Sequence, residues 1–129
     1  MGIDLVLTDT NVLILGLGGK EPYASYLRKL IENKRLVLSS VVVAEFLVRA
    51  TDEEEKTFDS LVREFSVLPV DLSVAKTAAD YRKTFMEKGK KLALPDCFIA
   101  ATCKVNKVVL ATSDKSGFPM KDVKIVVTF

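Results

Sequence analysis

The stretch that decides the fold is LTDTNVLI, residues 7–14, in which a carboxylate and an amide interrupt an apolar segment near the N-terminus. The apolar residues before Asp9 predict a short buried strand over residues 3–9, since such runs occur in strands that are covered on both faces. A carboxylate in this setting is costly to bury unless it is hydrogen-bonded, protonated, paired or bound to a metal. Asp9 therefore needs partners from elsewhere in the chain.

Strand and helix patterns alternate along the rest of the sequence. Strands are predicted over residues 35–40, 66–71, 107–114 and 123–129, and helices over residues 22–34, 40–50, 52–65, 73–89 and 94–106. This alternation predicts an α/β fold of three layers, with a central, mostly parallel sheet of about five strands between helices. With 129 residues and no repeats or long linkers, the chain is expected to form a single domain over residues 1–129.

The amino-acid composition limits the kinds of catalytic and metal site that the chain can form. Hydrophobic residues make up 49% and charged residues 28% of the chain, which is typical of a folded protein, and the net charge is only +2. The sequence has no histidine, which excludes Ser-His-Asp catalysis and zinc sites built on imidazole. Its two cysteines, Cys97 and Cys103, lie ~9 Å apart on the predicted helix, too far for a disulfide. We therefore expect two reduced core thiols.

The sequence also bears on location. No apolar run approaches the ~20 residues that a membrane helix needs. The N-terminus lacks a basic segment followed by a signal core and a cleavage site. These observations predict a cytoplasmic protein that does not enter a membrane.

Three further carboxylates stand among apolar neighbours: Glu45 in VVVAEFLV, Asp96 in LALPDCFIAA and Asp114 after VVLATS. Asp9 and Asp114 are placed at the carboxyl ends of predicted strands, where open α/β sheets bind ligands. Glu45 and Asp96 lie on helices that could line the same crevice. Carboxylates that meet there would repel one another unless a hard cation joined them, and oxygen-only ligands indicate Mg²⁺ or Mn²⁺.

Each of these acids also has a purely structural explanation. Asp9 could form an Asx turn, and Asp96 could serve the N-terminus of the helix that Pro95 opens. Asp114 could be a turn residue after a strand, and Glu45 could face solvent. The sequence alone leaves these alternatives open for each residue.

Four motifs, taken together and in order, resemble the successive motifs of the PIN-domain family of metal-dependent ribonucleases. They are LTDTNVLI, SSVVVAEFL, LPDCFIAATC and VVLATSDKSGF, and they span nearly the whole chain. The branch they resemble is the VapC-type toxins of toxin–antitoxin pairs. The resemblance implies a PIN-like nuclease domain that cleaves RNA with Mg²⁺ or Mn²⁺ and leaves a 5′-phosphate and a 3′-hydroxyl.

The resemblance also implies roles for individual residues. Asp9, Glu45, Asp96 and Asp114 would form the metal site and carry the catalysis. Three polar residues would support them: Asn11, Thr112 and Ser39. One departure stands out: many VapC-like chains have Asn in the third position of the last motif and Asp just before Phe, whereas this chain has Asp114 and Gly117 there.

An anionic substrate must reach an acidic pocket, so basic residues are expected around its rim. The densest cluster is MEKGKK, residues 86–91, just before the Asp96 motif. Lysines also solvate ordinary helix faces, so each assignment has a structural alternative. The candidates for RNA contacts are Arg49, Lys90, Lys91 and Lys115, with Lys20, Arg28 and Lys121 as further possibilities.

Other functions compete with the nuclease hypothesis. DTNVL is close to the opening motif of haloacid-dehalogenase-type phosphatases, but Asn11 replaces the second acid of that motif. A non-catalytic RNA-binding or assembly module is another alternative, as is an RNA-processing nuclease without an antitoxin. Small stand-alone PIN domains are usually toxins, so the resemblance implies a homodimer and a VapB-like antitoxin. The face that would form the dimer is not decided, with the helix over residues 52–65 and the C-terminal strand as candidates.

Overall fold

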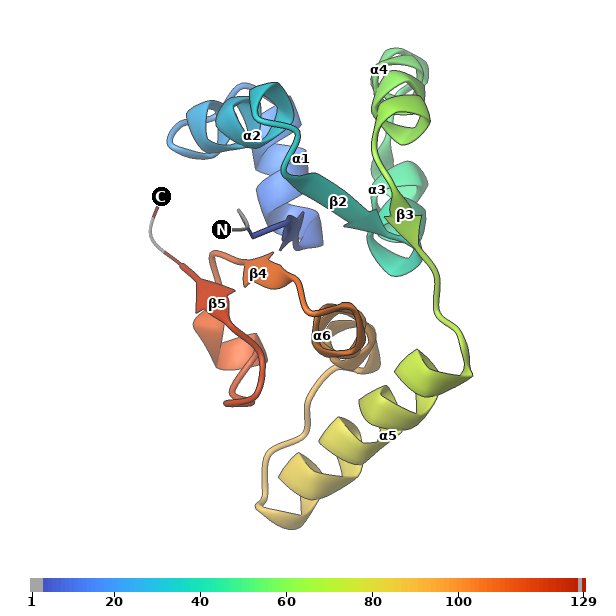
Figure 1. Cartoon of the computed structure of the whole chain (residues 1–129), viewed down its shortest axis with the longest axis vertical. Coiled ribbons are helices and arrows are strands. Elements are labelled where there is room, and N and C mark those ends of the chain that lie inside the picture. The colour runs from blue at the N-terminus through green and yellow to red at the C-terminus, as the bar shows by residue number, and fades with distance from the viewer. Residues whose placement is uncertain (1–3, 128) are drawn as a thin grey trace.

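A five-stranded sheet forms the centre of the molecule (Figure 1). The computed structural model describes residues 4–127 and residue 129. All four strand pairings are parallel, so the predicted fold class is confirmed and the sheet is entirely rather than mostly parallel. The strands lie in the order β3 (Val67–Leu68), β2 (Leu36–Ser39), β1 (Val6–Thr8), β4 (Val109–Ala111) and β5 (Ile125–Val126).

Helices cover the sheet from both sides. In Figure 1, α1 and α2 lie on one side of the central strands, and α5 and α6 lie on the other. In the described part of the chain the helices are α1 (Thr10–Leu17), α2 (Tyr23–Glu32), α3 (Ser40–Arg49), α4 (Asp52–Glu64), α5 (Leu72–Glu87) and α6 (Leu94–Asn106), with a short 3₁₀ turn η1 (Lys115–Gly117). This arrangement gives the three layers that the sequence predicts.

Most predicted elements are confirmed, and the strands are shorter than expected. Helix α6 has the predicted bounds, and the strand predicted over 107–114 covers only Val109–Ala111. Helix α1 was not predicted, because residues 12–15 are all apolar and show no helical period. Residue 3 of the first predicted strand and residue 128 of the last lie outside the described residues.

The connectivity places a crevice between β1 and β4. From β1 the chain builds β2 and β3 on one side, and it then returns through α5 and α6 to form β4 on the other side. The strand order therefore reverses between β1 and β4. In a doubly wound sheet, ligands bind at such a reversal, outside the carboxyl ends of the strands. The register pairs Thr8 with Ala111, so the next residues, Asp9 and Thr112, leave the sheet side by side.

The core confirms the expectation for the two cysteines. Cys97 and Cys103 are free and fully buried on α6. Burial raises the pKa of both thiols, that of Cys103 to about 12, which keeps them protonated and unreactive. Within the described residues, no helix has the length and apolar character needed to span a membrane.

Candidate active site

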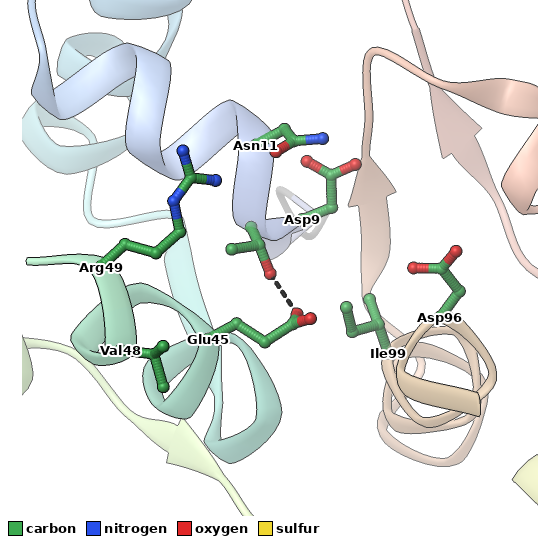
Figure 2. Close-up of a pocket in the computed structure, with 8 residues that line it drawn as sticks. Asp9, Asn11, Glu45, Val48, Arg49, Asp96 and Ile99 are labelled. Carbon is green, nitrogen blue, oxygen red and sulfur yellow. Dashed lines mark hydrogen bonds between the residues drawn. The ribbon is translucent and has the colours of Figure 1, made fainter. Parts of the chain in front are cut away.

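A cleft of about 360 Å³ lies at the point where the sheet order reverses (Figure 2). Figure 2 shows the carboxylates of Asp9, Glu45 and Asp96 around this opening; Asp9 directly precedes α1, Glu45 lies on α3 and Asp96 on α6. The cleft is lined by Asp9, Thr10, Asn11, Glu45, Val48, Arg49, Asp96 and Ile99. Three of the four acids that the sequence singles out therefore meet in one place, although they are 36 and 51 residues apart in the chain.

Asp9 is both a structural cap and a member of the cleft. Its Oδ1 accepts a hydrogen bond of 2.9 Å from the backbone N–H of Val12, which caps helix α1. Its Oδ2 accepts a hydrogen bond from the hydroxyl of Thr112. Burial raises the pKa of Asp9, with Asp114 and Glu45 adding repulsion, while the two hydrogen bonds oppose this shift. Asp9 therefore caps α1 rather than forming the Asx turn that was its structural alternative, and this role does not remove the carboxylate from the cleft.

Glu45 reaches the cleft from the middle of α3. It is half-buried, and its Oε1 accepts a hydrogen bond of 2.5 Å from the Thr10 hydroxyl, drawn as a dashed line in Figure 2. This bond joins the first turn of α1 to α3 and fixes the carboxylate toward the opening. Thr10 was missed at the sequence level because its partner lies 35 residues away, so nothing local marks the pair.

Asp96 lies in the first turn of α6 but does not cap it. The N-cap residue is Ala93, and the helix has no side-chain capping bond. Burial, together with repulsion from the nearby Glu45, Asp9 and Asp114 carboxylates, raises the pKa of Asp96 to about 6. Among the described residues, none donates a hydrogen bond to its carboxylate. Asp96 therefore does not cap the helix, but its carboxylate does lie in the first turn, where acidic side chains favour a helix N-terminus.

Asp114 borders the cleft without lining it. It follows β4 by three residues in an exposed turn, and its Oδ1 accepts hydrogen bonds from the N–H (3.2 Å) and the hydroxyl of Ser116. Its Oδ2 lies on the side of Asp96, because a Cβ built on Gly117 would lie 3.6 Å from that oxygen and 3.1 Å from Asp96 Oδ2. Asp114 is thus a turn residue, as one alternative held, and also a neighbour of Asp96.

The three supporting residues differ in how close they come to the acids. Thr112 is fully buried, donates its hydroxyl to Asp9, and accepts a hydrogen bond of 3.0 Å from the backbone N–H of Asp114. Asn11 is exposed and lines the cleft. Ser39 is fully buried outside the cleft lining, where its Oγ caps α3 by accepting from Val42 N–H at 3.0 Å.

The basic residues are distributed unevenly around the site. Arg49 lines the cleft, and in Figure 2 it lies on the side opposite Asp96. Lys91 and Lys115 are exposed. Lys90 donates a hydrogen bond of 2.7 Å to the carbonyl oxygen of Ser116, so it holds the loop that carries Gly117. The structure thus gives Lys90 a structural role that the sequence did not indicate.

The donor set fits a hard divalent cation. Asp9, Glu45, Asp96 and Asp114 offer carboxylate oxygens; burial raises the pKa of Asp9 and Asp96, and repulsion from neighbouring carboxylates acts in the same direction. Within the described residues, however, no three acidic, histidine or cysteine side chains stand close enough to enclose an ion. Mg²⁺ commonly keeps several waters and takes only one or two carboxylates from a protein.

The raised pKa of Asp96 predicts a pH-dependent stability in the absence of metal. Because folding disfavours the charged form, Asp96 destabilises the native state as pH rises from its usual pKa of 3.8 to its folded pKa of about 6. Relative to wild type, Asp96→Asn should therefore gain stability between pH 4 and 6 and reach a plateau of about 1 kcal/mol above it, after discounting for solvent screening. Urea unfolding in EDTA at several pH values measures this difference. A difference that shrinks with rising pH would contradict the assignment.

The fold and the cleft define an α/β domain with an oxygen-only acidic site at the reversal point of a parallel sheet. Comparison with known proteins gives the family. The PIN domain model matches residues 6–124. Ribonuclease VapC10 of Mycobacterium tuberculosis is 29% identical over 116 residues, which cover 90% of this chain and 87% of that protein.

A further relative and a solved structure give the same answer. Toxin FitB of Neisseria gonorrhoeae is 30% identical, over 94% of this chain and 96% of FitB. The structure of FitAB bound to a DNA fragment has a TM-score of 0.78 and 29% identity, covering 95% of this chain and 94% of the other. The chain belongs to the PIN-domain family, in its group of VapC and FitB toxin ribonucleases. This membership sets aside the phosphatase alternative.

Proposed function

We propose that this chain cleaves RNA internally in a reaction that depends on Mg²⁺ or Mn²⁺, and that it is the toxin of a toxin–antitoxin pair. One observation carries the chemistry: Asp9, Glu45 and Asp96 reach a single cleft from the start of α1, from α3 and from α6. Family membership supports the reaction, since relatives of this chain are named ribonuclease and toxin. Residues 1–129 would then form one nuclease domain.

In this proposal Asp9, Glu45, Asp96 and Asp114 hold the cation. When bound, the cation supplies an acidified water and a counter-charge for the phosphate. One of these carboxylates would also accept a proton from that water. The Thr112 hydroxyl orients Asp9, and the Thr10 hydroxyl orients Glu45. Asn11 lies beside Asp9 and lines the cleft.

Basic residues would bring the RNA to this acidic site. Arg49 is the one cation among the described residues that line the cleft, so it is the first candidate for a phosphate contact. Lys91 and Lys115 are exposed and would extend that contact along the RNA backbone. Lys90 is instead hydrogen-bonded to the Ser116 carbonyl oxygen. Ser39 would contribute only by fixing the start of α3, which carries Glu45.

The test of the proposed function is cleavage of labelled single-stranded RNA by the purified chain with Mn²⁺ or Mg²⁺. We expect cleavage that stops in EDTA and returns when Mn²⁺ is added back, with 5′-phosphate and 3′-hydroxyl ends. Asp59→Asn, which changes an exposed acid on α4, is the matched control and should cleave like wild type. Tight RNA binding without cleavage in any metal would favour the non-catalytic module instead.

We also propose two protein partners. FitB is named a toxin, and FitAB is known in complex with DNA, which supports an antitoxin of the VapB kind for this chain. Growth arrest on expression, relieved by co-expression of a small adjacent protein, would support it; an RNA-processing enzyme should not arrest growth.

Exposed apolar side chains, Leu47 and Val48 on α3 and Leu72 on α5, support a homodimer, which light scattering after size exclusion would test. Because its proposed substrate is RNA, we place its action in the cytoplasm.

A further inference from the structure

We infer that Gly117 is a positioning residue, whose missing side chain keeps open the space between the carboxylates of Asp96 and Asp114. A Cβ at this position would lie 3.1 Å from Asp96 Oδ2 and 3.6 Å from Asp114 Oδ2. The two oxygens thus approach one point from α6 and from the turn after β4. This inference rests on the proposed function, because the space matters only if a cation binds these acids.

The backbone does not require glycine at this position. The described glycines with positive φ are Gly19 and Gly89, and Gly117 is not among them. A residue with a side chain could therefore adopt the same backbone without strain. A side chain at position 117 would instead be limited by space. The atoms around that space are carboxylate oxygens rather than core side chains.

The loop that carries Gly117 is held firmly in place. Lys90 Nζ donates to the Ser116 carbonyl oxygen at 2.7 Å, and the Ser116 N–H donates to Asp114 Oδ1 at 3.2 Å. The next residue, Phe118, is buried, and its N–H bonds to the Lys115 carbonyl oxygen at 2.9 Å. The loop backbone therefore cannot easily move to make room for a methyl group at position 117.

The Asp96 side chain is the part that would move. Within the described residues no hydrogen bond holds its carboxylate, so a contact of 3.1 Å is relieved by turning Asp96 away from Asp114. Such a shift spoils the placement of two prospective ligands by a few tenths of an ångström, a displacement to which metal and catalytic sites are sensitive. It removes no core contact, so the fold should not suffer.

The experiment compares Mn²⁺ binding by wild type and Gly117→Ala with isothermal titration calorimetry. We expect about a tenfold weaker affinity for the variant, in line with other changes around metal ligands, and an unchanged melting temperature in EDTA. Gly18→Ala is the matched control, because its Cβ would approach the Ile14 carbonyl oxygen at the same 3.1 Å, away from the acids. It should bind Mn²⁺ like wild type.

The possible results separate this inference from the proposed function. If wild type binds no Mn²⁺ and cleaves no RNA, the proposed function fails. If wild type binds and Gly117→Ala binds equally well, the role of Gly117 is wrong while the nuclease stands. A Gly117→Ala chain that unfolds or melts several degrees lower in EDTA would also overturn the inference, since glycine would then serve packing.

Discussion

Asp96→Asn is expected to lower the rate of metal-dependent RNA cleavage about a thousandfold while leaving the fold at least as stable as wild type. Asn keeps the shape of the side chain and removes its charge. A ligand carboxylate contributes several kcal/mol to the stabilisation of charge in the transition state, and each 1.4 kcal/mol corresponds to a tenfold change in rate. Because burial and three neighbouring carboxylates raise the pKa of Asp96, removing its charge relieves both a desolvation cost and repulsion in the metal-free protein.

Single-turnover cleavage of labelled RNA in saturating Mn²⁺ measures this rate, and thermal unfolding in EDTA measures stability. Asp59→Asn carries the same chemical change on an exposed surface and should match wild type in both. A cleavage rate for Asp96→Asn within tenfold of wild type would show that this carboxylate is outside the chemistry. A large loss of stability would show instead that Asp96 supports the fold.

The sheet and most helices were predictable because the signals are local. Short apolar runs marked the strands, and Pro95 and the acidic start of α4 marked the beginnings of helices. Helix α1 was not predictable in this way, because every residue from Val12 to Leu15 is apolar and only the Asp9 cap marks its start. The strand at β4 was predicted too long because the expected range, 107–114, included Lys107 and the polar residues 112–114, which lie outside the strand Val109–Ala111.

The candidate site was predictable to the extent that charge in apolar surroundings is unusual. That rule identified Asp9, Glu45 and Asp96, which line the cleft, and Asp114, which borders it. It could not find Thr10, whose hydrogen bond to Glu45 is long-range. The sequence showed Gly117 as a departure from the family pattern. Which side chains surround this glycine is known only from the structure.

Asp9 shows why structural and functional explanations need not exclude each other. One carboxylate oxygen caps α1 and the other is held by Thr112, so the residue that starts the helix also fixes a charge at the cleft. The cap fixes where Asp9 stands, while burial raises its pKa and favours a bound cation. Thr112 is the residue that links these two effects, since it touches both Asp9 and the backbone of Asp114.

Thr112→Val is therefore expected to reduce cleavage about a hundredfold and to weaken Mn²⁺ binding about tenfold, the range found when groups that orient metal ligands are removed. Loss of the hydroxyl frees Asp9 Oδ2 and leaves the Asp114 N–H without its partner, at a cost of about 1–2 kcal/mol in unfolding free energy. It also removes a contact that lowers the pKa of Asp9, so metal binding should require a higher pH than in wild type.

Two variants decide whether this loss is specific. Thr112→Ser restores the hydroxyl and should recover most of the activity. Thr8→Val makes the same substitution at the end of neighbouring β1, where the buried Thr8 hydroxyl has no hydrogen-bond partner among the residues that the structure describes. Removing that unsatisfied group should leave cleavage unchanged and stability equal or higher. If Thr112→Val cleaves RNA like Thr8→Val, with the same pH profile for Mn²⁺ binding, then Thr112 only packs, and the hydrogen bond to Asp9 does not position the site.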